Sequence, residues 1–529
     1  MRHVLGALGV AAALVLGTAG TVSAQKPGGV LRVYHRDSPA TMSIYEEATI
    51  GVVAPMMGVF NNLVVFDPSQ KRNSLDGIVP DLAESWSWNE DGTALTVTLR
   101  PGVKWHDGKP FTANDVKCSW DLLQGKGDDK LRLNARPSWW VNLDHVSADS
   151  ELQATFHLKR RQPSFLALLA SAWSPVYPCH VPAAQMRQHP IGTGPFKFVE
   201  FKPNQSIKVV RNPDYWKPGL PYLDGIEWTI IPNRSTQILA FIAGQFDMTF
   251  PFEVTIPMLK DVRSQMPDAV CETGALNAAP NLLITGKPPF DNPELRKAVA
   301  MSLDRKALID ILGEGQGDLG TAMLPAPEGV WGMPAEMMRA LPGYDPDVAK
   351  SRATAREAMQ KLGYGPDHHL PVKITTRNLA IYRDPAAILI DQMKNIWIDG
   401  EIELVETAQF LPRLIRSDFT MAQSVLGNAL DDPDQIFYEN YICDSNRNYS
   451  HICDRDLDKL IDAQSAEPDR EKRKELVWEI DRRLQERAVR PILYYMRQAT
   501  CWRPEVKGIK LASNSIYNSW RFEDVWLDR

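Results

Sequence analysis

The stretch LAESWSWNEDGTALTVTLRPGVKWHDGKPFTANDV, residues 82–116, gives the clearest indication of the fold. Trp86 and Trp88 alternate with serines, a turn-forming Asn-Glu-Asp-Gly run follows at 89–92, and apolar and polar residues alternate again over 95–100. Alternation with a period of two is typical of strands with one buried face. The pattern therefore predicts two antiparallel strands joined by a tight turn. Thr112 then predicts the N-cap of a helix.

Composition and charge restrict the class of protein. The chain has 529 residues, 44% of them hydrophobic and 23% charged, with a formal net charge of −6. Single cores stop growing at about 250–300 residues, so two or three domains are expected. A negative charge argues against a nucleic-acid partner or an anionic membrane surface, because both require basic residues.

The N-terminal segment, residues 1–24, reads as a cleavable secretory signal. Arg2 and His3 precede an apolar run at 4–16, and Val-Ser-Ala at 22–24 supplies small residues before a predicted cut at Gln25. The apolar run is shorter than the ~20 residues that span a membrane, which disfavours an uncleaved anchor. No cysteine lies near the cut, so we expect no lipid anchor and a periplasmic location.

Beyond residue 280 the sequence predicts alternating strands and helices. The expected helices are residues 294–302, 304–312, 345–362, 384–395 and 469–487, and the expected strands are 372–375 and 491–496. In the last helix, Val477, Ile480 and Leu484 share an apolar face with Leu476. Asp469 with Arg473, and Glu479 with Arg483, have the i,i+4 spacing of ion pairs on the exposed face.

Several segments of the sequence resemble those of one protein family. Residues 82–116, IGTGPFKF at 191–198, RNPDYW at 211–216 and IAGQFDM at 242–248 together resemble the family 5 extracytoplasmic solute-binding proteins. That family includes the dipeptide and oligopeptide receptors of ABC importers. The resemblance covers essentially the whole chain after the signal. It implies an α/β, periplasmic-binding-protein-like (type II) two-lobed clamshell with an additional inserted domain.

The same resemblance implies the domain boundaries. Lobe I is discontinuous and comprises residues 25–60, 191–280 and 498–529. The inserted domain II covers 61–190, and lobe III covers 281–497. We expect a hinge where the chain crosses between the lobes, near 274–280 and 497–501.

Six cysteines in an exported chain permit disulfides. Cys443 and Cys453 flank a short polar loop, and dipeptide-binding relatives carry a bridge in a similarly placed loop. Cys118, Cys179, Cys271 and Cys501 allow three pairings. Cys271 with Cys501 is favoured because both flank the expected crossings, and buried free thiols are the alternative.

Candidate catalytic and metal motifs have simpler explanations. The G-x-G-x-x-G at 315–320 follows a predicted helix, so it indicates a loop and not a phosphate site. The His-His pair at 368–369 lies in a loop and lacks further ligands. His35, Asp37 and Ser38 are near neighbours in an extended segment, where side chains point in different directions. We expect no enzyme activity, no cofactor and no metal.

The resemblance also assigns candidate ligand residues. In peptide-binding relatives an acid in lobe III meets the peptide α-amino group, and the matching segment here reads GNALDDPD. The amine position falls on Ala429, next to Asn428, and Ala429 has no carboxylate, which weakens a dipeptide assignment. Asp431 can substitute if the register shifts by two. Asp432 and Asp434 are interpreted as turn and cap residues.

Other candidates lie near the ends of two strands. Arg377 follows a predicted lobe III strand and matches the carboxylate-binding arginine of dipeptide receptors, with Arg383 as the alternative. A surface arginine is the competing interpretation for each. The loop that contains Ser38 lines the cleft in this family. Tyr34 and Tyr45 flank that loop and can stack on a ligand or pack in the core.

The sequence thus predicts a monomeric periplasmic receptor of an ABC importer. It would capture a small solute, a peptide by family default, and deliver it to a permease and ATPase complex at the inner membrane. A metal chelate, an opine or an oligosaccharide is the alternative solute. A secreted hydrolase, and a chaperone or sensor with the same fold, are the alternatives from other classes.

Overall fold

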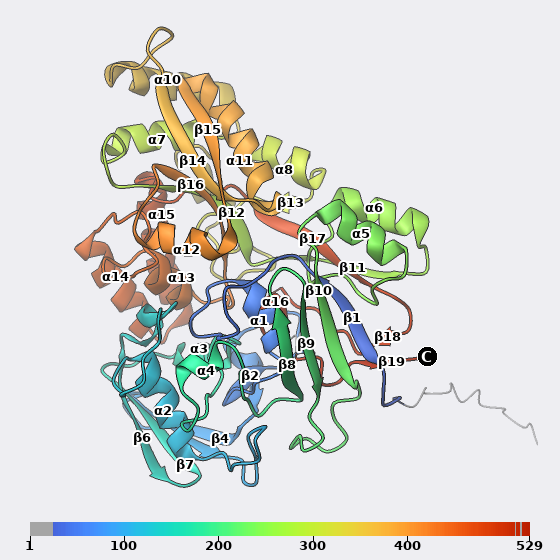
Figure 1. Cartoon of the computed structure of the whole chain (residues 1–529). Helices are drawn as coiled ribbons and strands as arrows, with labels where there is room; N and C mark the ends of the chain where they lie inside the picture. The colour runs from blue at the N-terminus through green and yellow to red at the C-terminus, as the bar shows by residue number, and fades with distance from the viewer. Residues whose placement is uncertain (1–24, 514, 519–520) are drawn as a thin grey trace, which may run out of the picture.

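The computed structural model describes residues 25–513, 515–518 and 521–529 (Figure 1). The predicted signal at 1–24 lies outside the described residues. Within the part of the chain that is described, no helix is both long and apolar enough to cross a membrane.

Three four-stranded sheets organise the chain. The first contains, in order, β1 (Val30–His35), β10 (Gly225–Ile230), β9 (Ser206–Arg211) and β8 (Phe196–Lys202). The second contains β4 (Ala83–Trp88), β5 (Ala94–Leu99), β7 (Gln153–Leu158) and β6 (Leu143–Ser150). The third contains β12 (Ala278–Ile284), β16 (Met421–Gly427), β14 (Leu370–Arg377) and β15 (Ile398–Val405).

The stretch at 82–116 folds as its pattern predicts. β4 and β5 pair antiparallel, with Trp86 opposite Val97. The Asn89 side chain accepts hydrogen bonds from the backbone N–H groups of Thr93 and Ala94, at 2.8 and 2.9 Å, and so closes the turn. Thr112 caps α2 (Ala113–Leu123). This hairpin opens the second sheet, which packs against α2 and occupies the lower left of Figure 1.

Shorter elements complete the first two regions. Those near the first sheet are α1 (Ile50–Met56), α5 (Arg234–Ile242) and α6 (Ile256–Gln265), together with the C-terminal β18 (Val506–Lys507), α16 (Ser515–Asn518) and β19 (Trp526–Leu527). Those near the second sheet are β2 (Val64–Phe66), β3 (Ile78–Pro80), α3 (Phe165–Ala170) and α4 (Ala183–Met186). α1 packs against α16, so the C-terminal segment returns to the N-terminal region.

The third sheet is mixed and is surrounded by helices (Figure 1). β14 runs parallel to both β15 and β16, while β12 is antiparallel to β16. The helices of this region are α7 (Pro293–Ser302), α8 (Arg305–Gly313), α9 (Ala335–Arg339), α10 (Val348–Lys361), α11 (Ala380–Met393), α12 (Thr407–Ile415), α13 (Pro433–Asn440), α14 (Arg455–Ala466) and α15 (Arg470–Glu486).

Two strands link the first and third sheets. β11 (Val270–Ala275) pairs antiparallel with β17 (Tyr495–Trp502), which also pairs with the short β13 (Gly317–Asp318). β11 continues into β12, and β17 leads to the C-terminal segment, so the chain crosses near the residues that the sequence indicated. The expected strand at 491–496 is wrong in its bounds. It begins only at Tyr495, after Pro491, which has no N–H for a ladder.

Three disulfides hold separate parts of the chain together. They join Cys118 to Cys179, Cys271 to Cys501, and Cys443 to Cys453. Cys271 and Cys501 are direct partners in the β11–β17 register, so this bridge lies within the crossing. The bridge between Cys443 and Cys453 closes the short loop that was predicted.

One expectation for the last helix is wrong. α15 carries Val477, Ile480 and Leu484 on its buried face as predicted, and Arg483 pairs with Glu479 at 2.6 Å on its surface. Arg473, however, is only 4% exposed. It pairs with Asp432 at 2.8 Å instead of lying on the surface beside Asp469, because α13 packs there and brings buried carboxylates to it.

Candidate functional site

A small cavity lies where all the parts of the chain meet. Its volume is about 60 Å³. Its lining comes from the segment between β1 and α1, from Arg136 and Trp173, from the ends of β14 and β16, from the two crossings and from Tyr517 of α16. Sites for small ligands often lie between parts of a protein, and this cavity has such a position.

Four arginines line this cavity: Arg36, Arg136, Arg377 and Arg447. No aspartate or glutamate is among the lining residues that the structure describes. Arg36 donates to Glu253 at 2.6 Å, and Arg447 pairs with Glu439 at 2.8 Å. The carboxylates therefore lie behind the arginines, and the cavity wall itself is positive.

Arg377 joins the two halves across the cavity. It ends β14, and its guanidinium pairs with Asp37, which follows β1. Thr407 Oγ1, at the start of α12, donates to Asp37 Oδ1 at 2.9 Å, and Arg377 donates to Tyr382 Oη at 2.8 Å. Asp37 thus accepts two bonds from the third-sheet half, which holds the halves in a closed arrangement.

Arg136 is placed differently from the other three arginines. Its guanidinium carbon lies 3.4 Å from the centre of the Trp173 ring, and it donates to the backbone carbonyls of Glu47 and Ala48 at 3.1 and 3.4 Å. No carboxylate of the described residues lies within ion-pair distance of it. Burial lowers the pKa of Arg136 to about 9, because a charge in an apolar site is disfavoured.

Glu47 is a second perturbed group beside the cavity. Burial raises the pKa of its carboxyl to about 7, and the charge of Asp37 acts in the same direction. Its Oε1 accepts a hydrogen bond from the Thr41 backbone N–H at 3.0 Å. This carboxyl therefore changes its charge near neutral pH.

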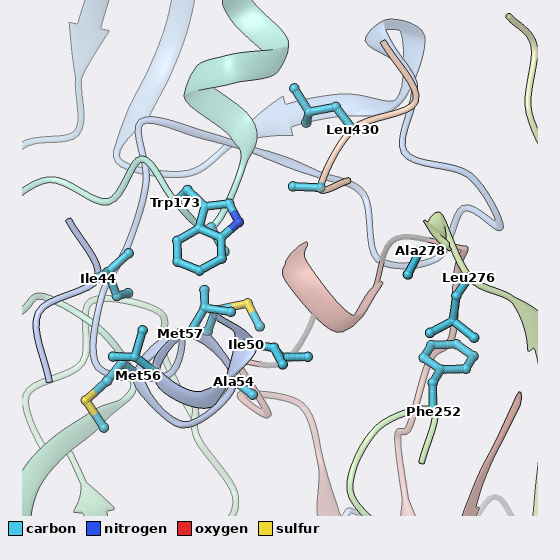
Figure 2. Close-up of a cluster of buried hydrophobic side chains, with 14 of the residues drawn as sticks. Ile44, Ile50, Ala54, Met56, Met57, Trp173, Phe252, Leu276, Ala278 and Leu430 are labelled. Atoms are coloured by element: carbon cyan, nitrogen blue, oxygen red, sulfur yellow. The ribbon is translucent and has the colours of Figure 1, made fainter. Parts of the chain in front are cut away.

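A close approach between α16 and β16 closes one side of the cavity. A Cβ atom at Gly427 would lie 1.8 Å from Tyr517 Oη, so only glycine fits there. Figure 2 shows α16 between Trp173 on one side and Leu276 and Ala278 on the other, with Ile50 of α1 nearby. The C-terminal segment therefore belongs to the site.

The segment GNALDDPD lies next to the cavity, but its predicted ligand residues do not line it. Asn428 donates to Asn277 Oδ1 at 3.2 Å, and the Ala429 carbonyl accepts from Asn518 at 2.5 Å. Asp431 accepts from the Val330 backbone N–H at 3.0 Å. These three residues hold the segment in place.

The candidates near the first strand have packing contacts. Tyr34 lies edge-on to Phe246, Tyr45 stacks on Tyr177 with ring centres 4.0 Å apart, and the Ser38 hydroxyl accepts from the Asn204 N–H at 3.0 Å. These are core and loop contacts, and none of the three lines the cavity.

The two candidate arginines lie in different places. Arg383 lies beside Asp384 in a separate groove that Arg234 also lines, whereas Arg377 lines the cavity. Arg377 is therefore the one residue of the predicted set that the structure places in the cavity wall. The other cavity arginines were missed, and no local pattern marks Arg36, Arg136 or Arg447.

A comparison with models of known protein families identifies the family of this chain. Residues 77–448 match the model of the bacterial extracellular solute-binding proteins, family 5 (middle region). This chain belongs to that family. It is therefore a solute-binding protein of ABC transport and a receptor, not an enzyme, as the sequence predicted.

Curated relatives of the chain bind different solutes. It is 28% identical to heme-binding protein A of Haemophilus influenzae over 448 residues, covering 79% of this chain and 78% of the relative. It is 27% identical to di/tripeptide-binding protein 1 of Pseudomonas aeruginosa over 486 residues, covering 85% of each. Membership of the family thus leaves the solute open.

A solved structure confirms the fold. The periplasmic binding protein DppA of Helicobacter pylori, in complex with the peptide STSA, superposes with a TM-score of 0.84. The match covers 95% of this chain and 99% of that chain at 22% identity. The α/β two-lobed fold predicted from the sequence is therefore correct.

Proposed function

We propose that this protein captures a small solute in the cavity between the β1–α1 half and the β14–β16 half, and presents the closed form to a permease and ATPase complex. The enclosed cavity, lined from every part of the chain, is the observation that carries the proposal. In this proposal the protein acts as a monomer in the periplasm. The ion pair between Asp37 and Arg377 supports closure as the working motion.

Closure requires that the solute distinguish the two states. A solute that binds the closed state better than the open state shifts the equilibrium towards closure, and one that binds both equally shifts nothing. β11 and β17, which form the crossing, are the elements on which the halves would rotate. The Cys271–Cys501 bridge fixes these strands to each other and leaves the residues on either side to bend.

A short peptide remains the first solute class to test. The di/tripeptide-binding relative supports it, and the absence of a carboxylate at Ala429 weakens it for peptides with a free amine. Metal chelates, opines and oligosaccharides are the competing classes, and the heme-binding relative adds a further one.

Thermal unfolding with a mixed solute library tests the proposal. A solute that binds only the folded receptor raises Tm in line with RT ln(1 + [L]/Kd). We expect at least one small solute to raise Tm and to reduce the radius of gyration measured by X-ray scattering. A library in which every class leaves both quantities unchanged would argue against a receptor role.

A further inference from the structure

Among the described residues that line the cavity, Arg136 is the buried cation without an ion-pair partner. Arg136 is 7% exposed, and its Nε has no hydrogen-bond partner among the described residues. Its other contacts are two backbone carbonyls and the face of Trp173. A buried charge is costly unless it is paired, so an unpaired guanidinium in a cavity wall calls for a counter-ion.

The neighbouring arginines are already neutralised within the chain. Arg36 has Glu253, Arg377 has Asp37, and Arg447 has Glu439. Their carboxylates are not among the cavity-lining residues. After these three pairs are counted, the positive charge of Arg136 remains, and no lining carboxylate balances it.

Resting on the receptor function proposed above, we propose that the solute carries a net negative charge and that its acidic group is the missing partner of Arg136. Trp173 covers one face of the guanidinium, and Nη1 and Nη2 each donate one hydrogen bond to a backbone carbonyl. Nε donates to none of the described residues, and a guanidinium can bind a carboxylate in a fork through Nε and one Nη. Ile50, Leu276 and Met496 also line the cavity, together with the polar side chains of Thr49, Gln498 and Tyr517, so the solute is small and carries both apolar and polar groups.

The same wall disfavours a free amine on the solute. No aspartate or glutamate is among the described lining residues, so an ammonium group would lose its hydration without a charged partner and would be repelled by Arg136. A peptide satisfies this chemistry when its amine is acylated or when a second acid gives it a net negative charge. A cationic peptide or a neutral sugar does not.

Pairs of matched solutes test the charge. The panel contains mono-, di- and tricarboxylic acids and N-acetylated dipeptides, each with its neutral amide, and adds free dipeptides and sugars. We expect the best binder by calorimetry to be an acid, with its amide at least about 30-fold weaker, as for a lost buried charge pair.

Variants of the full chain test the residue. Arg136→Gln should weaken the best acid at least about 30-fold, and Arg136→Lys should retain part of the affinity because it keeps the charge. Arg263→Gln, at an exposed position of α6, is the matched control and should bind as the wild type. Circular dichroism checks that each variant is folded. If Arg136→Gln does not fold, the affinity of Arg136→Lys for the acid still tests the role of Arg136.

The outcomes separate the two proposals. An amide, a free dipeptide or a sugar that binds as tightly as any acid would overturn the anionic solute and leave the receptor role standing. Full affinity for the acid in Arg136→Gln would overturn the role of Arg136 alone. Failure of every acid in the panel to bind would overturn the anionic solute, and the wider solute library described above would then test the capture of a solute by itself.

Discussion

Two buried arginines in this molecule both lie against a tryptophan, but they differ in whether a carboxylate neutralises their charge. Arg473 of α15 and Arg136 of the cavity both lie over a tryptophan, at 4.7 Å from Trp331 and 3.4 Å from Trp173. Arg473 forms ion pairs with Asp432 and Asp434, whereas Arg136 forms none with a carboxylate of the described residues. The charge of Arg473 is neutralised within the chain. In our proposal, the charge of Arg136 is neutralised only by an acidic group of the bound solute.

The pKa values follow this difference. Burial by itself lowers the pKa of both guanidinium groups, but Asp432 and Asp434 reverse the direction for Arg473 and raise it. Burial also acts to raise the pKa of Asp434, yet Arg473 and hydrogen bonds from Ser164, Ser465 and Gln464 hold it below its usual value. A satisfied network of this kind stabilises a fold, and an unsatisfied one indicates a binding site.

The largest expected effect is at Asp434. Asp434→Ala should lower the free energy of unfolding by about 3–5 kcal/mol, because it removes one partner of a buried pair and leaves Arg473 partly unbalanced. Denaturant unfolding measures this. Asp456→Ala is the control, since Asp456 pairs with Lys459 on the exposed face of α14. Similar losses in the two variants would contradict the structural role of the buried network.

The second effect depends on pH and concerns Glu47. Its pKa in the folded protein, about 7, exceeds the ordinary value of 4.5, so the folded state binds more protons between these two values. Stability should therefore fall as the pH rises through this window, by about 3 kcal/mol in total. Glu47→Gln should remove that slope from unfolding curves measured between about pH 5 and about pH 8.

Asp37 and Arg132 are the charged groups that act on Glu47, so they must stay unchanged in this experiment. Glu475→Gln, on the exposed side of α15, serves as the control and should keep the slope. An unchanged slope in Glu47→Gln would show that this carboxyl is not the titrating group.

The third effect concerns closure. The double variant Asp37→Asn/Arg377→Gln removes the ion pair between the halves, so the open state should gain population. We expect the affinity for a solute to fall about tenfold and the radius of gyration without solute to rise. The control is Arg32→Gln, whose partner Asp247 lies in the same half. If neither quantity changes, the pair does not hold the halves together.

The smallest effect is on stability at Arg136. Because this charge is uncompensated without a solute, Arg136→Gln should change the free energy of unfolding by less than about 1 kcal/mol. Arg473→Gln is the matched variant and should cost at least about 3 kcal/mol. Equal losses in the two variants, measured by denaturant unfolding, would remove the distinction between the two regions.

Local features of the sequence predicted local features of the fold. The alternation around Trp86 and Val97 specified a hairpin, and Thr112 specified a helix start, because both depend on neighbours a few residues away. Arg377 was selected by its resemblance to the carboxylate-binding arginine of the family, and it lines the cavity. Arg473 was misplaced because helical periodicity gives the direction of a side chain and not what packs against it.

The candidate site was less predictable than the fold. Tyr34 and Tyr45 were chosen as aromatic residues near the expected cleft, and Asp431 by alignment with relatives. The structure gives all three packing or loop contacts. Arg136 follows no strand end and belongs to no motif. Its significance depends on the missing carboxylate, which is a property of all the chain segments around it.

The sequence by itself determined the family, the α/β halves and the hairpin of β4 and β5. Alternation, turn residues and family motifs each consist of contiguous residues, so they can be recognised without the tertiary structure. Only the tertiary structure decided which charges are neutralised. Asp37 meets Arg377 across 340 residues of chain, and no carboxylate of the described residues forms an ion pair with Arg136. Ion pairing depends on distances in space, and no local pattern fixes distances between segments so far apart.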